Sequence, residues 1–365
     1  MLIAADRIWQ EGALVPGLAA ETDGRRVLAL RPLGADRPDH HVPLLVPGCT
    51  DLQVNGGGGV LFNADPTPEG IAAIAAAHHR LGVAQILPTV ITDAPEVLEA
   101  AADAVIACRD APGIAGIHIE GPHIAPERRG THEARFIRPL DARTLAVLRR
   151  LRAAGVPVLL TLAPETADPA LLAEAKALGV VLSAGHSMAD AAQARAAMAQ
   201  GVTMATHLFN AMPQMTARAP GLIAAALLSG LWCGLIADGI HVSAEMLAIA
   251  LRVAGDRCFL VSDAMPTVGG PDRFSLYGRE IAVRDGRLVN AEGALAGAHL
   301  DLPQAMRHLV ALTGASPETA IAMATDRPRR AMGLAPLAVG PGTALRDLLA
   351  LDHDLHMVPL PGRDA

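Results

Sequence analysis

Eight short apolar segments alternate with helical segments over most of the chain. The segments predicted as strands cover residues 51–55, 85–90, 116–120, 158–162, 179–184, 203–207, 233–238 and 258–263. The segments between them have the apolar spacing of helices, and several begin with proline or are followed by glycine. Such alternation is typical of a parallel sheet covered by helices. It predicts an α/β fold, a (β/α)₈ TIM-like barrel whose working face lies at the C-terminal ends of the strands.

The two ends of the chain have a different pattern. Residues 1–46 contain short alternating segments punctuated by Gly, Pro and Asp, and residues 335–365 contain two more strand-like segments. We therefore predict a small β-sandwich domain built from 1–46 and 335–365, and a barrel over 47–334. Residues 266–297 interrupt the barrel pattern with short alternating pieces, which predicts an irregular or hairpin insertion before a final helix at 301–312.

The composition narrows the class of protein. The chain of 365 residues carries a formal net charge of −7, which argues against a nucleic acid or an anionic membrane as a partner. No apolar stretch is long enough to span a bilayer, and the N-terminus lacks the basic and apolar regions of a signal peptide. The four cysteines are scattered, mostly in apolar contexts, and suit reduced core residues. We therefore expect a cytoplasmic protein.

Three residues with metal-ligand chemistry stand at the ends of predicted strands. His186 and His207 end consecutive strands, and Glu120 ends a strand two places earlier. A glutamate after an apolar run is costly to bury without a counter-ion. One carboxylate and two imidazoles with a position left open suit one divalent metal ion, foremost Zn²⁺, with Fe²⁺, Mn²⁺ or Co²⁺ as alternatives.

Asp263 ends the eighth predicted strand and is the candidate catalytic residue. It could cap a helix or form an ion pair, but the Ala-Met-Pro that follows does not start a helix at once. On a barrel it would face the mouth near the three metal-type ligands. A carboxylate there can take a proton from a metal-activated water and hand it to a leaving amine.

Several motifs occur in the order found in one known family. They are Gly116-Ile-His-Ile-Glu-Gly-Pro-His123, Arg129-Gly-Thr-His132, Ala184-Gly-His-Ser187, Thr206-His-Leu-Phe-Asn-Ala-Met-Pro213, Ile236-Ala-Asp-Gly-Ile-His241 and Leu260-Val-Ser-Asp-Ala-Met265. Together they resemble the N-acetylglucosamine-6-phosphate deacetylases of the amidohydrolase superfamily. The match runs from Pro47 to Leu334.

The resemblance implies hydrolysis of the N-acetyl group of N-acetylglucosamine 6-phosphate to glucosamine 6-phosphate and acetate. It assigns the metal to Glu120, His186 and His207, and makes Asp263 the general base and acid. The residues that it implies for substrate binding are His132, Asn210, Ala211, Arg218 and His241. Arg218 would reach the substrate phosphate of a neighbouring subunit, so the resemblance also implies a homodimer.

The first predicted strand departs from many members of the superfamily, which place His-x-His there for a second metal. This chain has Gln53 and Asn55, and because amides are poor ligands for such metals, one tight ion is expected. Other departures are His123, Ala219 and Ala298, where the family often has an aromatic residue, an acid and a serine. His123 is either a site residue or a packed loop histidine. The further site candidates are Gln53, Asn55, His123, Leu295, Ala296 and Gly297.

Three alternatives remain open. One is a deacetylase of another N-acyl amino sugar, such as N-acetylgalactosamine 6-phosphate; Arg218 would favour a phosphorylated substrate. Another is a cyclic-amide hydrolase, which the absence of a strand-end lysine disfavours, because the one lysine, Lys176, lies in a predicted helix. The third is a barrel that serves as a scaffold, which would have no need of Asp263 and the three ligand-type residues together.

Overall fold

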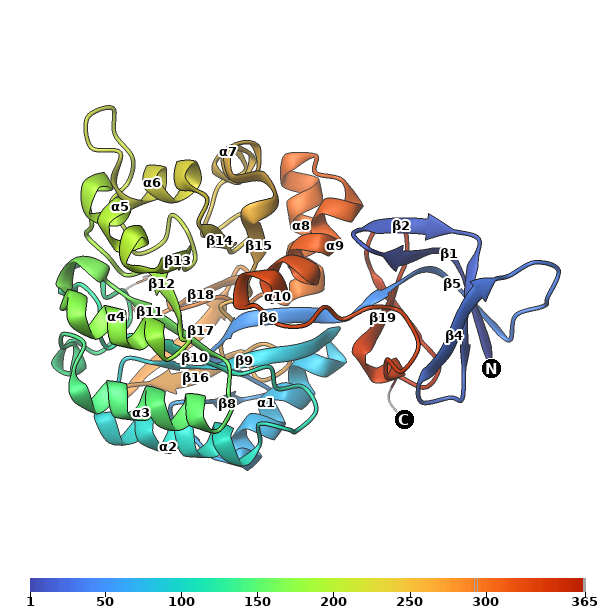
Figure 1. The fold of residues 1–365 in the computed structure, drawn as a ribbon, viewed down its shortest axis with the longest axis horizontal. Coiled ribbons are helices and arrows are strands. Elements are labelled where there is room, and N and C mark those ends of the chain that lie inside the picture. Colours follow the sequence, from blue (N-terminus) through green and yellow to red (C-terminus); the bar gives the residue numbers. More distant parts are fainter. Residues whose placement is uncertain (292, 294, 364–365) are drawn as a thin grey trace.

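The computed structural model describes residues 1–291, 293 and 295–363. Its centre is a sheet of eight parallel strands (Figure 1). In order along the sheet, these are β6 (Cys49–Val54), β9 (Val83–Ile91), β10 (Ile117–Glu120), β11 (Val158–Leu162), β12 (Val181–Ala184), β13 (Val202–Ala205), β14 (Trp232–Leu235) and β15 (Cys258–Leu260). A parallel bridge between Val54 and Ala264 joins the two edges of the sheet. The predicted barrel is confirmed.

Three strands end two or three residues earlier than predicted. β13, β14 and β15 end at Ala205, Leu235 and Leu260, so the predicted ends at residues 207, 238 and 263 are wrong. The backbone φ is 30° at His207 and 51° at Asp263. Because a positive φ is incompatible with an extended strand, the ladder stops before these residues.

Helices surround the barrel (Figure 1). They are α1 (Pro68–Arg80), α2 (Pro95–Ala107), α3 (Ala142–Ala153), α4 (Pro169–Ala177), α5 (Ala191–Gln200), α6 (Gly221–Ser229), α7 (Ala244–Ala254), α8 (Leu302–Thr313), α9 (Pro317–Ala324) and α10 (Asp326–Met332). Short 3₁₀ turns are η1 (Pro126–Arg128), η2 (Ala134–Phe136), η3 (Pro164–Thr166), η4 (Gly255–Arg257) and η5 (Leu345–Asp347). Side-chain caps begin most of the long helices; in α5, Asp190 and Gln193 form a reciprocal capping box. α9 and α10 lie outside every predicted helix.

A second sheet, of seven strands, is built from both ends of the chain. Its order is β20-β19-β5-β1-β3-β4, with β2 paired to β1. The strands are β1 (Leu2–Gln10), β2 (Ala13–Pro16), β3 (Leu18–Thr22), β4 (Val27–Pro32), β5 (His40–Pro47), β19 (Leu348–Leu351) and β20 (Met357–Val358). This confirms the small β domain made from the N- and C-terminal segments, which lies at one end of the barrel (Figure 1).

The predicted insertion after the eighth barrel strand is also confirmed. It contains a three-stranded antiparallel sheet of β16 (Arg273–Leu276), β17 (Arg279–Arg284) and β18 (Arg287–Val289). A two-stranded sheet, β7 (Gly56–Gly57) with β8 (Val60–Leu61), follows the first barrel strand. Buried Leu61, Met265 and Ile281 belong to one apolar cluster, so the insertion is packed onto the barrel near its mouth.

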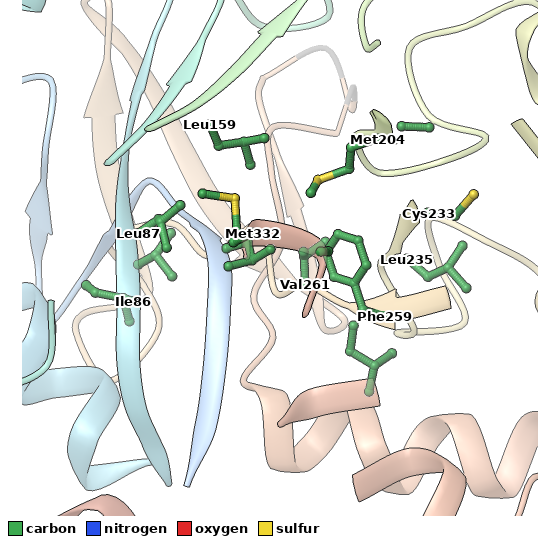
Figure 2. Close-up of a cluster of buried hydrophobic side chains, with 14 of the residues drawn as sticks. Ile86, Leu87, Leu159, Met204, Cys233, Leu235, Phe259, Val261 and Met332 are labelled. Carbon is green, nitrogen blue, oxygen red and sulfur yellow. The ribbon is translucent and has the colours of Figure 1, made fainter. Parts of the chain in front are cut away.

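Apolar side chains fill the barrel below its mouth. Leu159 of β11, Met204 of β13, and Phe259 and Val261 in and just after β15 converge in the interior (Figure 2). α10 contributes Met332 to the same buried cluster. Cores of this density tolerate little change in volume, so the strands are held at defined separations.

No helix within the described residues is long and apolar enough to cross a membrane. All four cysteines are free thiols, and three of them are buried. This agrees with the expectation of reduced core residues.

Asp51 is a carboxyl group buried within the first barrel strand. Its Oδ1 accepts hydrogen bonds from the backbone N–H groups of Gln53 and Ser262, at 3.2 and 3.3 Å. Its Oδ2 has no described partner. Burial raises the pKa of Asp51 to about 7, because the charged form is poorly solvated there.

Asp51 is expected to make the protein less stable as the pH rises. The pKa of Asp51 in the folded protein lies above the unfolded value of 3.8. Its contribution to the free energy of unfolding is therefore fully present below pH 4 and is lost as the pH rises through about 7. A rise of this size corresponds to roughly 4 kcal/mol in the free energy of unfolding. The variant Asp51→Asn should not show this loss of stability with rising pH, because asparagine does not titrate. Unfolding midpoints of both proteins between pH 5 and pH 8 test this, and a difference between them that does not change with pH would contradict it.

Candidate metal centre and active site

Glu120, His186 and His207 meet at the mouth of the barrel. Oε1 of Glu120 lies 3.2 Å from Nε2 of His186 and 3.0 Å from Nε2 of His207. The two imidazole nitrogens are themselves 3.0 Å apart. Glu120 ends β10, while the histidines lie just beyond β12 and β13 with φ values of 49° and 30°. The parallel strands therefore place three ligand-type atoms at the corners of one small triangle.

The hydrogen bonds of His186 show that this triangle fits a cation. Its Nδ1 lies 2.7 Å from the carbonyl oxygen of Arg128, which can only accept, so Nδ1 carries the proton. Nε2 of the neutral ring then presents a lone pair to the carboxylate of Glu120 and to His207. One proton can satisfy one of the three contacts, whereas a metal ion bound by all three atoms removes the repulsion in each. Carboxylate and imidazole ligands suit Zn²⁺ and similar divalent ions.

The electrostatics of the cluster also favour positive charge. Burial opposes ionisation of Glu120, but the neighbouring rings of His207 and His186 outweigh burial and hold its pKa well below its usual range. Burial likewise opposes charge on His207, but the contact with Glu120 outweighs it and raises the pKa of the ring. A pocket that stabilises a carboxylate beside an imidazolium is one that attracts a cation.

Asp263 lies beside the cluster and is held by two amide side chains. Nδ2 of Asn55 donates to its Oδ1 at 2.7 Å, and Nε2 of Gln53 donates to the same oxygen at 3.1 Å. The Gln53 amide also contacts Oε1 of Glu120 at 3.0 Å. Burial, reinforced by the negative charge of Glu120, raises the pKa of Asp263 to about 6. Gln53 thus bridges the ligand cluster and the candidate acid–base group, while Asn55 contacts the acid–base group alone.

His132 lies against the cluster from the loop after β10. Its ring centroid is 4.5 Å from that of His186, and its Nδ1 is 2.7 Å from Oγ1 of Thr92. Donor atoms of Glu120, His132 and His186 all lie within 4.8 Å of one another, so His132 is within reach of a bound ion. Nε2 of His207 lies 3.0 Å from Oε1 of Glu120 and 3.0 Å from Nε2 of His186, so His207 also remains a candidate for the third ligand. Burial lowers the pKa of His132 to about 3, which keeps the ring neutral.

His241 and the loop after β13 also line the cavity that contains the ligand cluster. Nδ1 of His241 is 2.6 Å from Oδ2 of Asp238, which orients the ring. Asn210 donates to the carbonyl oxygen of His207, and Ala211 has a φ of 52°. The cavity enclosed by these groups has a volume of about 170 Å³. Its lining residues are Asn55, Ile91, Glu120, Gly130, Thr131, His132, His186, His207, Asn210, Ala211, Ile236, His241, Asp263, Met265, Leu295 and Gly297.

A larger cavity of about 420 Å³ lies elsewhere, between α1 and the C-terminal residues Arg346 and Arg363. It contains none of the strand-end residues and no carboxylate. The smaller cavity is therefore the candidate active site.

Four of the candidates from the sequence do not line this cavity: Gln53, which contacts Glu120 and Asp263 from behind it, and His123, Ala296 and Arg218. His123 is buried, and its ring nitrogens lie 3.1 Å from the Arg138 carbonyl oxygen and 3.0 Å from Oγ1 of Thr144. Of the two alternatives for His123, these contacts favour the packed histidine. Ala296 is buried but does not line the cavity, whereas its neighbours Leu295 and Gly297 do. Arg218 is exposed on the loop before α6 and does not reach the cavity of its own chain.

Other residues of the site were not among the candidates. Asp238 stands three residues before His241, within a motif that carries the family resemblance, so the spacing could have identified it. Thr92 lies just beyond the end of β9, at the same face of the barrel. Nothing in the sequence pairs Thr92 with His132, because the two are joined only by the fold.

Comparison with known proteins agrees with this geometry. The profile of the amidohydrolase family matches residues 44–338. An N-acetylgalactosamine-6-phosphate deacetylase from Shewanella sp. (strain ANA-3) is 39% identical over 302 residues, covering 80% of this chain and 76% of the relative. The N-acetylglucosamine-6-phosphate deacetylase of Mus musculus is 34% identical over 336 residues, covering 86% and 81%.

Solved structures give the same result. The N-acetylglucosamine-6-phosphate deacetylase from Pasteurella multocida superposes with a TM-score of 0.90 at 27% identity, covering 100% of this chain and 99% of the other. The enzyme from Mycobacterium smegmatis gives 0.88 at 31% identity, covering 98% and 97%. The resemblance expected from the motifs is confirmed.

We expect the purified protein to hold one tightly bound divalent ion per chain. Three ligand atoms with an open position make one site, and Gln53 and Asn55 offer amides where a second ion would need stronger ligands. Elemental analysis measures the stoichiometry, and removal of the ion by a chelator should lower the thermal unfolding midpoint. Two strongly bound ions per chain in a fully active preparation would rule out the single site.

Proposed function

The chain belongs to the amidohydrolase family, and on that basis we propose that it hydrolyses the N-acetyl group of N-acetylglucosamine 6-phosphate to glucosamine 6-phosphate and acetate. The observation that carries this proposal is the cavity in which Glu120, His186 and His207 face Asp263. Its chemistry is that of amide hydrolysis assisted by a metal ion.

In this proposal Glu120, His186 and His207 hold one divalent ion, Zn²⁺ first, with Fe²⁺, Mn²⁺ or Co²⁺ as alternatives. When bound there, such an ion activates water and polarises the amide carbonyl group. The Nδ1–H bond of His186 to the Arg128 carbonyl orients the ring and increases the basicity of Nε2.

Asp263 moves the protons. Gln53 and Asn55 both donate to its Oδ1, which leaves Oδ2 to accept a proton from the attacking water. The protonated carboxyl group then donates to the nitrogen of the sugar as the C–N bond breaks. A pKa near 6 suits a group that must both take and give a proton close to neutral pH.

The histidines of the cavity walls bind the substrate. Neutral His132, oriented by Thr92, lies beside the cluster, where it contacts the acetyl carbonyl. His241, whose Nδ1 is bound by Asp238, presents Nε2 to the sugar. Asn210, Ala211, Leu295 and Gly297 line the remaining space, partly through backbone groups.

The phosphate group is bound across a homodimer. Arg218 is exposed on its own chain, so it can serve a phosphate only in a neighbouring subunit or after movement of its loop. We assign it to the neighbouring subunit. We also place the protein in the cytoplasm, because four free thiols suit a reducing compartment.

A second candidate substrate is N-acetylgalactosamine 6-phosphate. It is favoured by the relatives from Shewanella and from Escherichia coli O157:H7, which are 39% and 34% identical and are named for that activity. A cyclic-amide hydrolase is disfavoured further, because Lys176 packs beside Gly201 at the end of α5 and not at a strand end. Acetate release from both phosphorylated isomers and from unphosphorylated N-acetylglucosamine tests the proposal. Release from neither phosphorylated sugar would refute it.

Asp263→Asn should keep the fold and the metal but lose nearly all turnover. General acid–base catalysis contributes roughly 10²–10⁴ in rate, and here one group serves two steps. The asparagine can still accept from Gln53 and Asn55, so the cavity is preserved. The rate of acetate release and the metal content are measured on one preparation. If the variant keeps a tenth of the wild-type rate, Asp263 is not the proton-transfer group.

Arg218→Ala should weaken binding of the phosphorylated sugar and leave the unphosphorylated sugar almost unaffected. Charge-assisted hydrogen bonds contribute roughly 1.5–3 kcal/mol, which appears as a raised KM. Arg37→Ala, an exposed arginine of the β domain, is the matched control. Mixing Arg218→Ala with Asp263→Asn tests the dimer, because a mixed pair holds one site with both groups intact. If mixed dimers form without recovery of activity, Arg218 does not act across the interface.

A further inference from the structure

A layer of polar side chains crosses the barrel directly beneath the metal-type ligands. Thr89 of β9, His118 of β10, Thr161 of β11, Ser183 of β12 and Thr206 just beyond β13 are all buried. Five neighbouring strand segments thus contribute one polar group each. Such a layer is unusual in a barrel interior, which branched apolar side chains normally fill.

Hydrogen bonds link the layer into one chain. His118 Nε2 lies 2.7 Å from Oγ1 of Thr161, which lies 2.6 Å from Oγ1 of Thr206. Oγ1 of Thr206 in turn lies 2.6 Å from Oγ of Ser183. On the other side of the ring, His118 Nδ1 lies 3.4 Å from Oγ1 of Thr89.

The direction of these hydrogen bonds follows from Thr89. Its hydroxyl donates to the Leu87 carbonyl and accepts from the N–H group of Val54, so it can only accept from His118. The proton of the ring is therefore on Nδ1, and Nε2 accepts from Thr161. A second proton would place a charge in the barrel interior, where burial of a charged ring is costly.

The remaining hydroxyls have no choice of role. The proton of Thr161 goes to His118, so Thr206 must donate to Thr161, and Ser183 must donate to Thr206. His118 is thus the acceptor on which the order of the whole chain depends. Hydrogen bonds in such a chain strengthen one another.

The chain is attached to each candidate metal ligand. His118 stands two residues before Glu120 on the same face of β10, and Thr206 directly precedes His207. Next to His186, Gly185 lies so close to Thr161 and Thr206 that an added Cβ would be 2.7 Å from Cγ2 of Thr161 and 3.0 Å from Cβ of Thr206. The backbone next to His186 is therefore packed closely against both threonines.

We propose that His118 is a positioning residue, which orders the hydroxyl chain and so holds Glu120, His186 and His207 at the separations that bind the metal ion. This rests on the metal site of the proposed function. Its role is distinct from that of the ligands, because His118 does not line the candidate active site.

The test is the affinity for Zn²⁺, measured by competition with a chromophoric chelator, together with the visible spectrum of the Co²⁺-loaded protein. His118→Leu removes the acceptor and is expected to weaken Zn²⁺ binding about 10- to 100-fold. His118→Gln, which keeps an acceptor for Thr161, should restore most of the affinity. Thr161→Val interrupts the same chain from β11 with little change in volume and should weaken binding as well.

His123→Leu is the matched control. This substitution likewise removes a buried histidine. The ring of His123 is hydrogen-bonded to one threonine and one carbonyl group, and His123 does not line the cavity. It should lower the unfolding midpoint by a similar amount while keeping the Zn²⁺ affinity of the wild type. If His118→Leu fails to fold, Thr161→Val carries the same comparison.

Wild-type Zn²⁺ affinity in His118→Leu or in Thr161→Val, or an equal loss in His123→Leu, would overturn the proposal. Failure of the proposed function is a separate result, since it would appear as absence of acetate release by the wild-type protein with its ion bound.

Discussion

Three atoms with lone pairs, Oε1 of Glu120 and the Nε2 atoms of His186 and His207, lie within 3.2 Å of one another at the barrel mouth. Left to themselves, such atoms repel, and no local sequence preference brings them together. The parallel sheet does so, because it aligns the ends of β10, β12 and β13. The barrel sheet and its buried interior hold these three atoms in place.

The contact also depends on strained backbone. His186, His207 and Asp263 all have positive φ values, between 30° and 51°, directly after strands. For residues with a side chain, such conformations cost on the order of 1–3 kcal/mol each and persist only where the surroundings enforce them. The apolar layer around Phe259 and the hydroxyl chain above it provide that enforcement.

The sequence identified the main elements for physical reasons that are local. The alternation of apolar strands with capped helices, interrupted only after Asp263, is sufficient to predict the barrel and its insertion. The sequence pattern did not predict α9 and α10, because these helices are short and depend on contacts with β15 and β6. The strand ends were placed too late at His207 and Asp263, since hydrophobicity does not register a change in φ. His123 shows a similar limit: its position in a motif suggested a site residue, but its partners, Arg138 and Thr144, are visible only in the fold.

The sequence by itself determined which chemistry the chain carries: one carboxylate and two imidazoles at strand ends, a further carboxylate on the last strand, and amides in place of a second pair of histidines. These are residue identities, and the order of strands along a barrel follows from the order along the chain. Only the tertiary structure decided how those groups act on one another. The proton on Nδ1 of His186, the two amides on Oδ1 of Asp263, and the support of His132 by Thr92 each join residues more than 39 positions apart. A hydrogen bond depends on distance and direction in space, and those exist only once the barrel has formed.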